Sequence, residues 1–333
     1  MSITIKDVAK LAGVSISTVS RVINDSKPVS PDIRERVLRV IEETKYVPNP
    51  VARSLVLRKS NFIGVIVPDI ANYKTGEMLN GIEEVGKIYG YDILLCNSYG
   101  EFKEEKRYID LLLNKQVAGI IFVSWNLTEE SISLLKASNI PTIYVGKNAK
   151  DFDIVSVGID HYQAGADAAK YLLGKKFKKV CVVEVKSKDS ANDAVIVSGF
   201  ADEFRKKGKV FQKLDIPYSK DKIEECYQFM NDLIAKGDKL PDVFFVTGDE
   251  AAVGVVNALL DNGIKIPDQV SVLGYDNSKI AKIVRPKLTA VSQPLYDIGA
   301  LAIGVLIKHI GGQDTNEKVT VLPHSIVERE SVR

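Results

Sequence analysis

The chain has 333 residues, of which 45% are hydrophobic and 26% charged, and its formal net charge is +2. This length exceeds what one ordinary hydrophobic core accommodates, so we expect two or three folding units. The sequence contains neither an apolar run of ~20 residues, as a membrane span requires, nor the apolar leader of a secreted protein, so we expect a cytoplasmic protein.

The first 60 residues differ in charge from the rest of the chain. They carry a net charge of +5, whereas the remaining residues carry −3. A small basic segment on a slightly acidic body indicates that this segment meets a polyanion.

Three helices are predicted in this basic segment. Thr4 is placed to N-cap a first helix through residue 11, with Asp7 completing a capping box, and Gly13 ends the helix. A second helix is expected over 16–24. A third follows the Ser-Pro pair at 30–31 and runs to about residue 44, because serine caps helices and proline suits their first turn.

The first two helices predict a helix-turn-helix in residues 5–23, IKDVAKLAGVSISTVSRVI. The inner faces are expected to hold the apolar residues Val8, Ala9, Leu11, Ala12, Val19, Val22 and Ile23. The outer face of the second helix offers Ile16, Ser17 and Arg21, with further hydroxyls on Ser15, Thr18 and Ser20. A helical hairpin with polar exposed residues and no DNA function is the alternative.

After residue 61, short branched apolar runs alternate with helical stretches. These runs predict buried parallel strands and are FIGVIV (62–67), DILLCN (92–97), AGIIFV (118–123), KVCVVEV (179–185), DVFFVT (242–247) and VSVLGY (270–275). They are too many for one comfortable sheet. We therefore predict two doubly wound α/β subdomains with a break near residues 158–160, and a ligand site at the carboxyl ends of the strands.

Several of these segments resemble the LacI/GalR family of bacterial repressors, and the resemblance covers essentially the whole chain. The similar segments are DVAKLAGVSISTVSRVIN, VSPDIRERVLRVIEETKYVPNPVARSLVLRKS, GVIVPD, GIEE, GYDN, LTAVSQP and VERES. Among family members, those of catabolite control in Gram-positive bacteria are the most alike. The resemblance implies a head (1–49), a hinge (50–60), a core N-subdomain (61–160 plus about 291–320) and a core C-subdomain (161–290 plus about 321–333), in a fold like that of periplasmic binding proteins.

For DNA recognition, the resemblance implies that the second helix lies in the major groove. Ile16 and Ser17 would select bases, and Arg21 can donate two hydrogen bonds to guanine. Phosphate contacts are implied for Ser15, Thr18, Ser20, Asn24, Ser30, Tyr46 and Asn49. For any one of these polar side chains, an ordinary cap or surface role is the alternative.

Residues 50–57 correspond by resemblance to a hinge helix that folds against its dimer mate on DNA. Leu55 would wedge between base pairs in the minor groove, Ala52 allows close approach, and Arg53 reaches the backbone or base edges. An exposed linker leucine without function is the alternative. Two heads bound in this way imply a homodimer on a two-fold symmetric operator.

An effector site is implied between the subdomains. Its candidates are Asp69, Tyr73, Ser124, Trp125, Asp160, Asp193, Asp249 and Asp276. Trp125 can instead be a packing residue, and the aspartates can instead cap the helices that follow them. Asp193 stands where sugar-binding relatives carry an arginine, so we expect a vestigial pocket, or one for a cationic or otherwise different ligand, instead of an ordinary sugar site.

A partner protein is the second kind of signal that the resemblance implies. In the catabolite-control branch this partner is the phosphocarrier protein HPr phosphorylated on serine, which docks near YDIGALAIGVLIKHI. Tyr296 and Asp297 match the family pattern there. Gly304 and Ile307 depart from it, since the family has an arginine at the first position and often a threonine at the second, and a phosphoserine needs basic partners.

Other classes of protein remain as alternatives. The chain has no phosphate-binding glycine motif or nucleophile motif, and its three cysteines and three histidines are scattered, so we expect no enzyme, cofactor or metal site. A LacI-type local repressor that answers to a small molecule is one alternative. A cytoplasmic ligand-binding protein without DNA function is another.

Overall fold

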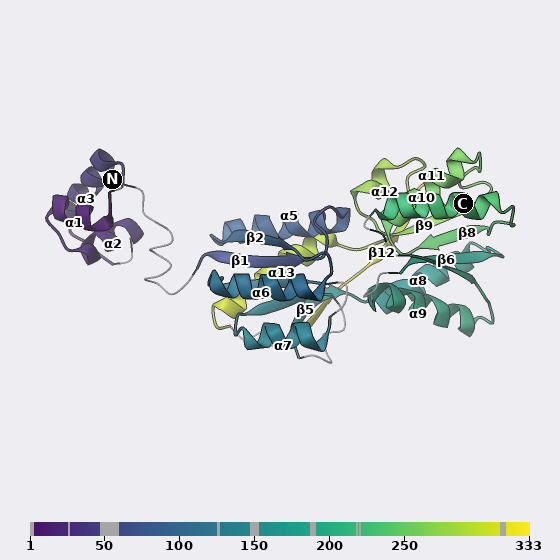
Figure 1. Ribbon diagram of the computed structural model, residues 1–333, viewed down its shortest axis with the longest axis horizontal. Coiled ribbons are helices and arrows are strands. Elements are labelled where there is room, and N and C mark those ends of the chain that lie inside the picture. Colours follow the sequence, from purple (N-terminus) through teal and green to yellow (C-terminus); the bar gives the residue numbers. More distant parts are fainter. Residues whose placement is uncertain are drawn as a thin grey trace. The chain divides into compact units, whose positions relative to one another are not determined.

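The computed structural model describes residues 3–25, 27–46, 60–124, 127–146, 153–186, 191–217, 219, 221–313 and 318–333. The chain divides into two compact units, residues 1–60 and residues 61–333, here called the head and the core (Figure 1). Among the described residues, no helix is long and apolar enough to cross a membrane.

The head contains the three expected helices, α1 (Ile5–Ala12), α2 (Ile16–Asn24) and α3 (Pro31–Thr44). The capping box that begins α1 is confirmed, since the Thr4 hydroxyl accepts from the Asp7 amide and the Asp7 carboxylate accepts from the Thr4 amide at 2.9 Å. Gly13 ends α1 at φ 63°, in the left-handed region that glycine enters without strain.

The core of the head is made of small and branched side chains. The buried ones are Val8, Ala9, Ala12, Val19, Val22 and Val37. The expectation for Leu11 was wrong, because 62% of its surface is exposed. At 100° per residue, Leu11 lies about 60° or more away from the buried stripe of α1, so it faces solvent.

The core is built on two six-stranded sheets, as the two-subdomain prediction required. The first sheet has the order β11-β5-β4-β3-β1-β2, with all pairs parallel. Its strands are β1 (Phe62–Val67), β2 (Asp92–Asn97), β3 (Gly119–Val123), β4 (Thr142–Val145), β5 (Val155–Ile159) and β11 (Val319–Leu322). We call this sheet and its helices the N-subdomain.

The second sheet has the order β12-β10-β9-β8-β6-β7, in which the β10–β12 pair is antiparallel and the others are parallel. Its strands are β6 (Val180–Val185), β7 (Gln212–Ile216), β8 (Val243–Val246), β9 (Ser271–Asp276), β10 (Thr289–Ser292) and β12 (Ser325–Val327). We call this sheet and its helices the C-subdomain. Its central strands β6, β8 and β9 are buried along their whole length, as strands covered on both faces must be.

Helices cover both faces of each sheet (Figure 1). The N-subdomain has α5 (Tyr73–Ile88), α6 (Phe102–Asn114), α7 (Glu129–Ala137) and α13 (Leu295–Ile310). The C-subdomain has α8 (His161–Gly174), α9 (Ala191–Lys206), α10 (Lys222–Ala235), α11 (Asp249–Asp261) and α12 (Lys279–Ile283). Close helix crossings depend on glycine, because a Cβ at Gly81 of α5 would lie 2.2 Å from the Tyr296 carbonyl oxygen of α13.

The chain crosses between the subdomains after β5, after β10 and after β11. The last two crossings lie slightly later than the expected boundaries at about 291 and 320. β10 pairs through Ser292 with β9, and β11 pairs through Leu322 with β5, so strand pairing carries each boundary two residues further.

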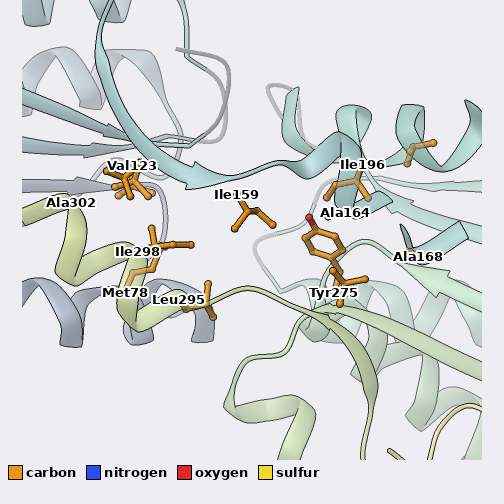
Figure 2. Close-up of a cluster of buried hydrophobic side chains, with 14 of the residues drawn as sticks. Met78, Val123, Ile159, Ala164, Ala168, Ile196, Tyr275, Leu295, Ile298 and Ala302 are labelled. Atoms are coloured by element: carbon orange, nitrogen blue, oxygen red, sulfur yellow. The ribbon is translucent and has the colours of Figure 1, made fainter. Parts of the chain in front are cut away.

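One hydrophobic cluster runs through both subdomains. Figure 2 shows Met78, Ile298 and Ala302 on the N-subdomain side, Ala164, Ile196 and Tyr275 on the C-subdomain side, and Ile159 and Leu295 between them. The crossing segments therefore carry part of the buried surface that joins the two halves.

Candidate functional site

The head presents α2 with its apolar side buried and its polar side exposed. Val19 and Val22 are 0% and 4% exposed, whereas Ile16 is 45% exposed. Ser17 and Arg21 are also exposed. The three candidate base contacts therefore lie on the accessible side of one short helix.

Hydroxyl groups gather at the start of α2. Ser15 is the N-cap, and its Oγ accepts from the Thr18 amide at 3.1 Å. The same Oγ lies 2.7 Å from Ser17 Oγ and 2.8 Å from Thr18 Oγ1. The first turn of α2 also leaves backbone amides at the positive end of the helix dipole, which favours an anion such as phosphate.

The other head candidates have mixed surroundings. Ser30 is exposed and precedes α3 without a side-chain cap bond. Ser20 is half-buried, and the Tyr46 ring packs against the head core, which accounts for part of its role. Five candidates lie outside what the structure describes, namely the side chain of Asn24 and the residues Asn49, Ala52, Arg53 and Leu55.

The core contains a cavity between the N- and C-subdomains, at the carboxyl ends of their strands. Its volume is about 60 Å³. Apolar side chains such as Met78 and Ile298 line one part, while Asp193, Asp276 and Gln293 line another. The cavity is therefore acidic on the C-subdomain side and mostly apolar on the N-subdomain side, where Lys74, Thr75 and Ser124 are the polar lining residues.

Asp276 is aimed into the cavity by an unusual backbone turn. Asp276 and Asn277 have φ values of 106° and 57°, which are strained for residues other than glycine. Gln293 Nε2 donates to Asp276 Oδ1 at 2.6 Å, and Arg329 donates to Asn277 Oδ1 at 2.5 Å. Burial raises the pKa of Asp276 to about 6, against the opposing effect of Lys74.

Asp249 supports this turn from behind. Its Oδ2 accepts from the Ser278 amide at 2.7 Å and from the Ser278 hydroxyl at 2.9 Å. Its Oδ1 has no hydrogen-bond partner among the described residues. Burial, and then the Asp276 charge, raise the pKa of Asp249 well above its usual range.

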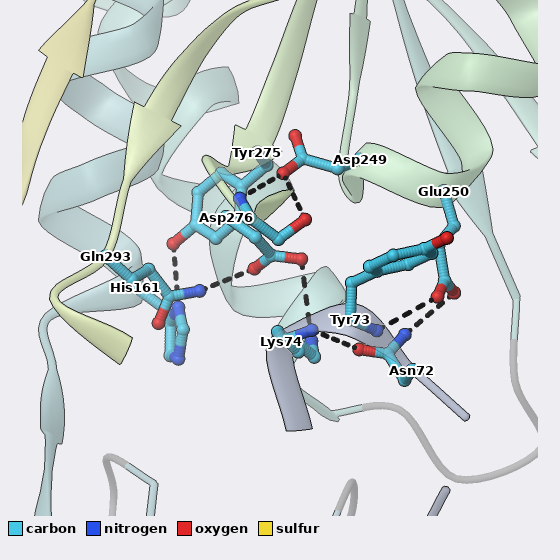
Figure 3. A network of polar contacts seen from close by, with 10 residues as sticks. Asn72, Tyr73, Lys74, His161, Asp249, Glu250, Tyr275, Asp276 and Gln293 are labelled. Carbon is cyan, nitrogen blue, oxygen red and sulfur yellow. Dashed lines mark hydrogen bonds and ion pairs between the residues drawn. The ribbon is translucent and has the colours of Figure 1, made fainter. Parts of the chain in front are cut away.

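Lys74 was not predicted, although it lines the cavity. It lies in the first turn of α5, where its Nζ is 3.8 Å from Asp276 Oδ2 (Figure 3). The Asp276 carboxylate raises the pKa of Lys74 above its ordinary value, while burial opposes that shift. A sequence signal existed, because a lysine at the positive end of a helix is unfavourable unless an acidic group lies opposite.

Further hydrogen bonds cross between the subdomains around Lys74. Asn72, the N-cap of α5, donates from Nδ2 to Glu250 Oε2 at 2.8 Å, and the Tyr73 amide donates to Glu250 Oε1 at 3.3 Å. On the same helix, Glu77 Oε1 accepts from the Lys279 amide at 2.7 Å. The beginning of α5 is thus bonded to the C-subdomain at several points (Figure 3).

The remaining effector candidates have structural partners. Ser124 lines the cavity, but its hydroxyl donates to the buried Glu105 carboxylate at 2.8 Å. Asp160 caps α8 by accepting from the Gln163 amide, and Asp69 accepts from the Ala71 amide. Asp69, Tyr73, Asp160 and Asp249 are not among the lining residues of the cavity, and Trp125 lies outside the described residues.

Of the eight effector candidates, the cavity therefore brings together Ser124, Asp193 and Asp276. Sequence reasoning also missed His161 and Tyr275, which line the same cavity. His161 Nδ1 lies 2.7 Å from the Tyr275 hydroxyl, and burial raises the pKa of Tyr275.

The expected partner-protein surface lies at the start of α13. The Tyr296 hydroxyl donates to Glu84 Oε2 at 2.7 Å, and Asp297 is exposed. Gly304 is half-exposed, and a Cβ built on it would meet no atom within 4 Å. This surface has room for a larger residue at 304 but carries none.

Comparison with known proteins places both units. Residues 4–49 match the family described as "Bacterial regulatory proteins, lacI family", and residues 169–332 match the "Periplasmic binding protein-like domain". Over 333 residues, the chain is 36% identical to "Catabolite control protein A" of Priestia megaterium, with 100% of both chains covered.

Two solved structures share the fold. The lac repressor dimer bound to operator and the anti-inducer ONPF matches with a TM-score of 0.88 and 23% identity, over 99% of each chain. Transcription regulator CcpA of Lactococcus lactis matches with a TM-score of 0.73 and 29% identity, over 82% of this chain and 99% of that one. The chain belongs to the LacI family of bacterial DNA-binding transcription regulators.

Proposed function

We propose that this protein acts in the cytoplasm as a homodimer that binds a palindromic operator and takes part in carbon catabolite control. The observation that carries the proposal is full-length similarity to catabolite control protein A at 36% identity, together with a head whose α2 exposes Ile16, Ser17 and Arg21. A two-fold symmetric protein reads a two-fold symmetric site.

In this proposal α2 lies in the major groove of each half-site. Arg21 reads a guanine, while Ile16 and Ser17 contact neighbouring base edges. The hydroxyl-rich start of α2 binds phosphate and so fixes the register of the helix. Leu55 opens the central base step, as the resemblance to relatives implies.

A fluorescence titration of labelled operator DNA at two salt concentrations tests the DNA proposal. When binding releases counterions, the logarithm of the binding constant falls linearly with the logarithm of the salt concentration. The slope is set by the number of phosphates contacted. A fragment of residues 61–333, which is a compact unit by itself, serves as the control and should not bind. Salt-independent binding, or equal binding by that fragment, would contradict the proposal.

The catabolite-control proposal is tested with the phosphocarrier protein. Operator binding is measured with HPr, with HPr phosphorylated on serine, and without either. Phosphorylated HPr, but not unphosphorylated HPr, should strengthen operator binding by about 1–3 kcal/mol, which is the usual size of a regulatory coupling. An identical affinity in all three mixtures would favour the local repressor.

A local repressor that answers to a small molecule is the second candidate. The specific observation in its favour is the cavity lined by Lys74, Asp193 and Asp276, which lies where ligands of such folds bind. Its volume and acidic side favour a small ligand with a cationic group over a neutral sugar.

A further inference from the structure

The charges around the cavity are divided unequally between the two halves of the core. Lys74 comes from the N-subdomain, whereas Asp193, Asp249, Glu250 and Asp276 all come from the C-subdomain. After Asp276, the charges of these three other carboxylates also act on Lys74. One ammonium group of the first half therefore faces an acidic side of the second half, where Asp276 is its ion-pair partner.

The surroundings of this ammonium group resemble a binding site for a small amine. Asp276 supplies a carboxylate 3.8 Å from Lys74 Nζ. The Lys74 side chain is half-buried, with 31% of its surface exposed. Lys74 lines the cavity together with Met78 and Ile298. A primary alkylammonium ion would be bound in the same way, with its ammonium group against carboxylates and its alkyl chain along apolar surface.

The geometry favours an organic cation over a metal ion. Among the described residues, no group of three or more His, Cys, Asp and Glu side chains is placed to hold a metal. Lys222 also acts on the charge of Asp276, but it belongs to α10 of the C-subdomain and does not join the halves.

We propose that the acidic side of the cavity is a primary-ammonium site that the chain fills with its own Lys74, so that the two halves of the core close on each other without an external effector. Lys74 takes the place that an effector takes in a ligand-dependent regulator. The hydrogen bonds from Asn72 and Tyr73 to Glu250, and from Lys279 to Glu77, join the two halves in this arrangement.

This inference rests on the proposed function in one respect. If the protein binds DNA as a dimer, a closed core would fix the spacing of its two heads. Loss of Lys74 leaves Asp276 buried beside other carboxylates without the ammonium group that faces it from the N-subdomain. The cost of that arrangement opens the cleft.

Hydrogen exchange of the full-length protein without DNA tests the proposal, because two of the crossing donors are backbone amides, those of Tyr73 and Lys279. Lys74→Ala should speed exchange at both amides about tenfold, as a local opening does. Amides of β1, buried in the N-subdomain, check that the variant is folded. Lys74→Met, which retains an apolar stem, should open the cleft to the same extent and is used if the alanine variant unfolds.

Chemical rescue then identifies the ligand class. n-Propylammonium supplies the methylenes and charge that Lys74→Ala lacks, so it should restore slow exchange, whereas n-propanol and sodium chloride at equal concentration should not. It should not rescue Lys74→Met, whose stem occupies the space. Lys87→Ala, at an exposed position near the end of the same helix, should behave as the unaltered protein.

Unchanged exchange in both Lys74 variants, or equal rescue by propanol or salt, overturns the inference. Failure of n-propylammonium to rescue a folded Lys74→Ala also overturns it. None of these measurements involves DNA, so failure of the operator titration would leave them unaffected.

Discussion

The head and the core place their polar side chains in opposite environments. In the head, Ile16, Ser17 and Arg21 face solvent on one side of α2. In the core, Asp249 and Asp276 are buried and bonded to groups of the protein itself. An exposed surface suits a large polyanion, whose charge supplies the binding energy. A buried polar cluster instead holds the N- and C-subdomains in one arrangement.

The largest expected effect lies in the head. Arg21→Ala should weaken operator binding by about 1–3 kcal/mol per half-site, because the proposed bidentate guanine contact would be lost in each. It should also relax sequence preference at one symmetric position, as measured by selection of bound sequences. Arg39→Ala removes the same charge from the exposed side of α3 and should weaken all DNA equally and slightly. An unchanged sequence profile for Arg21→Ala would remove it from the reading surface.

Substitution of a buried polar residue in the core should lower the stability of the protein, whereas substitution of an exposed residue on the α2 surface of the head should not. Glu105 accepts from Ser124 and Ser131, both at 2.8 Å, and is 3% exposed. Glu105→Ala should lower the free energy of unfolding by about 2–4 kcal/mol, since two buried hydroxyls lose their partner. Urea denaturation measures the loss. Glu104→Ala, the neighbouring carboxylate in a partly exposed pair with Arg107, should cost less than about 1 kcal/mol, and equal losses would contradict the contrast.

The pH dependence of the cavity sharpens the comparison further. The pKa of Asp276 is raised to about 6 in the folded protein, so its protonated form is favoured on folding. The stabilisation is complete below the unfolded value and is lost as the pH rises through about 6. Between pH 5 and pH 7 the stability of the unaltered protein should therefore fall by about 1 kcal/mol relative to Asp276→Asn. Urea denaturation at each pH measures both stabilities. If the free energies of unfolding of the two proteins change equally with pH over this range, Asp276 does not titrate there.

The smallest expected effect is in the exposed cap of α1. Thr4→Ala should destabilise that helix by about 0.5–1 kcal/mol, because the capping hydroxyl is lost. Hydrogen exchange at the Asp7 amide follows the change, and Thr4→Ser, which retains the hydroxyl, should restore protection. If serine and alanine behave alike, the capping box contributes nothing to the head.

The local structure of the head could be predicted because short-range rules decide it. Capping at Thr4, the left-handed turn at Gly13 and the helical spacing of Val19 and Val22 are all visible along the chain. Leu11 was misplaced, because its exposure depends on the exact angle of α1 against the other helices. The strands β1, β2, β3, β6, β8 and β9 were equally visible as continuous apolar runs, whereas β4, β5, β7, β10, β11 and β12 were not predicted.

What the sequence by itself determined was the helical head, the two α/β subdomains, the family and the acidic character of the effector segments. Tertiary structure decided which acidic residues meet. Asp160 accepts from the Gln163 amide three residues ahead, and Asp249 accepts from the Ser278 amide of its own subdomain. Asp193 and Asp276 reach the cavity instead, and Asp276 meets Lys74, which lies some 200 residues away in the chain. The physical reason is that capping and periodicity are local properties of the backbone, whereas a charge pair between lobes depends on how two separately folded sheets close on each other.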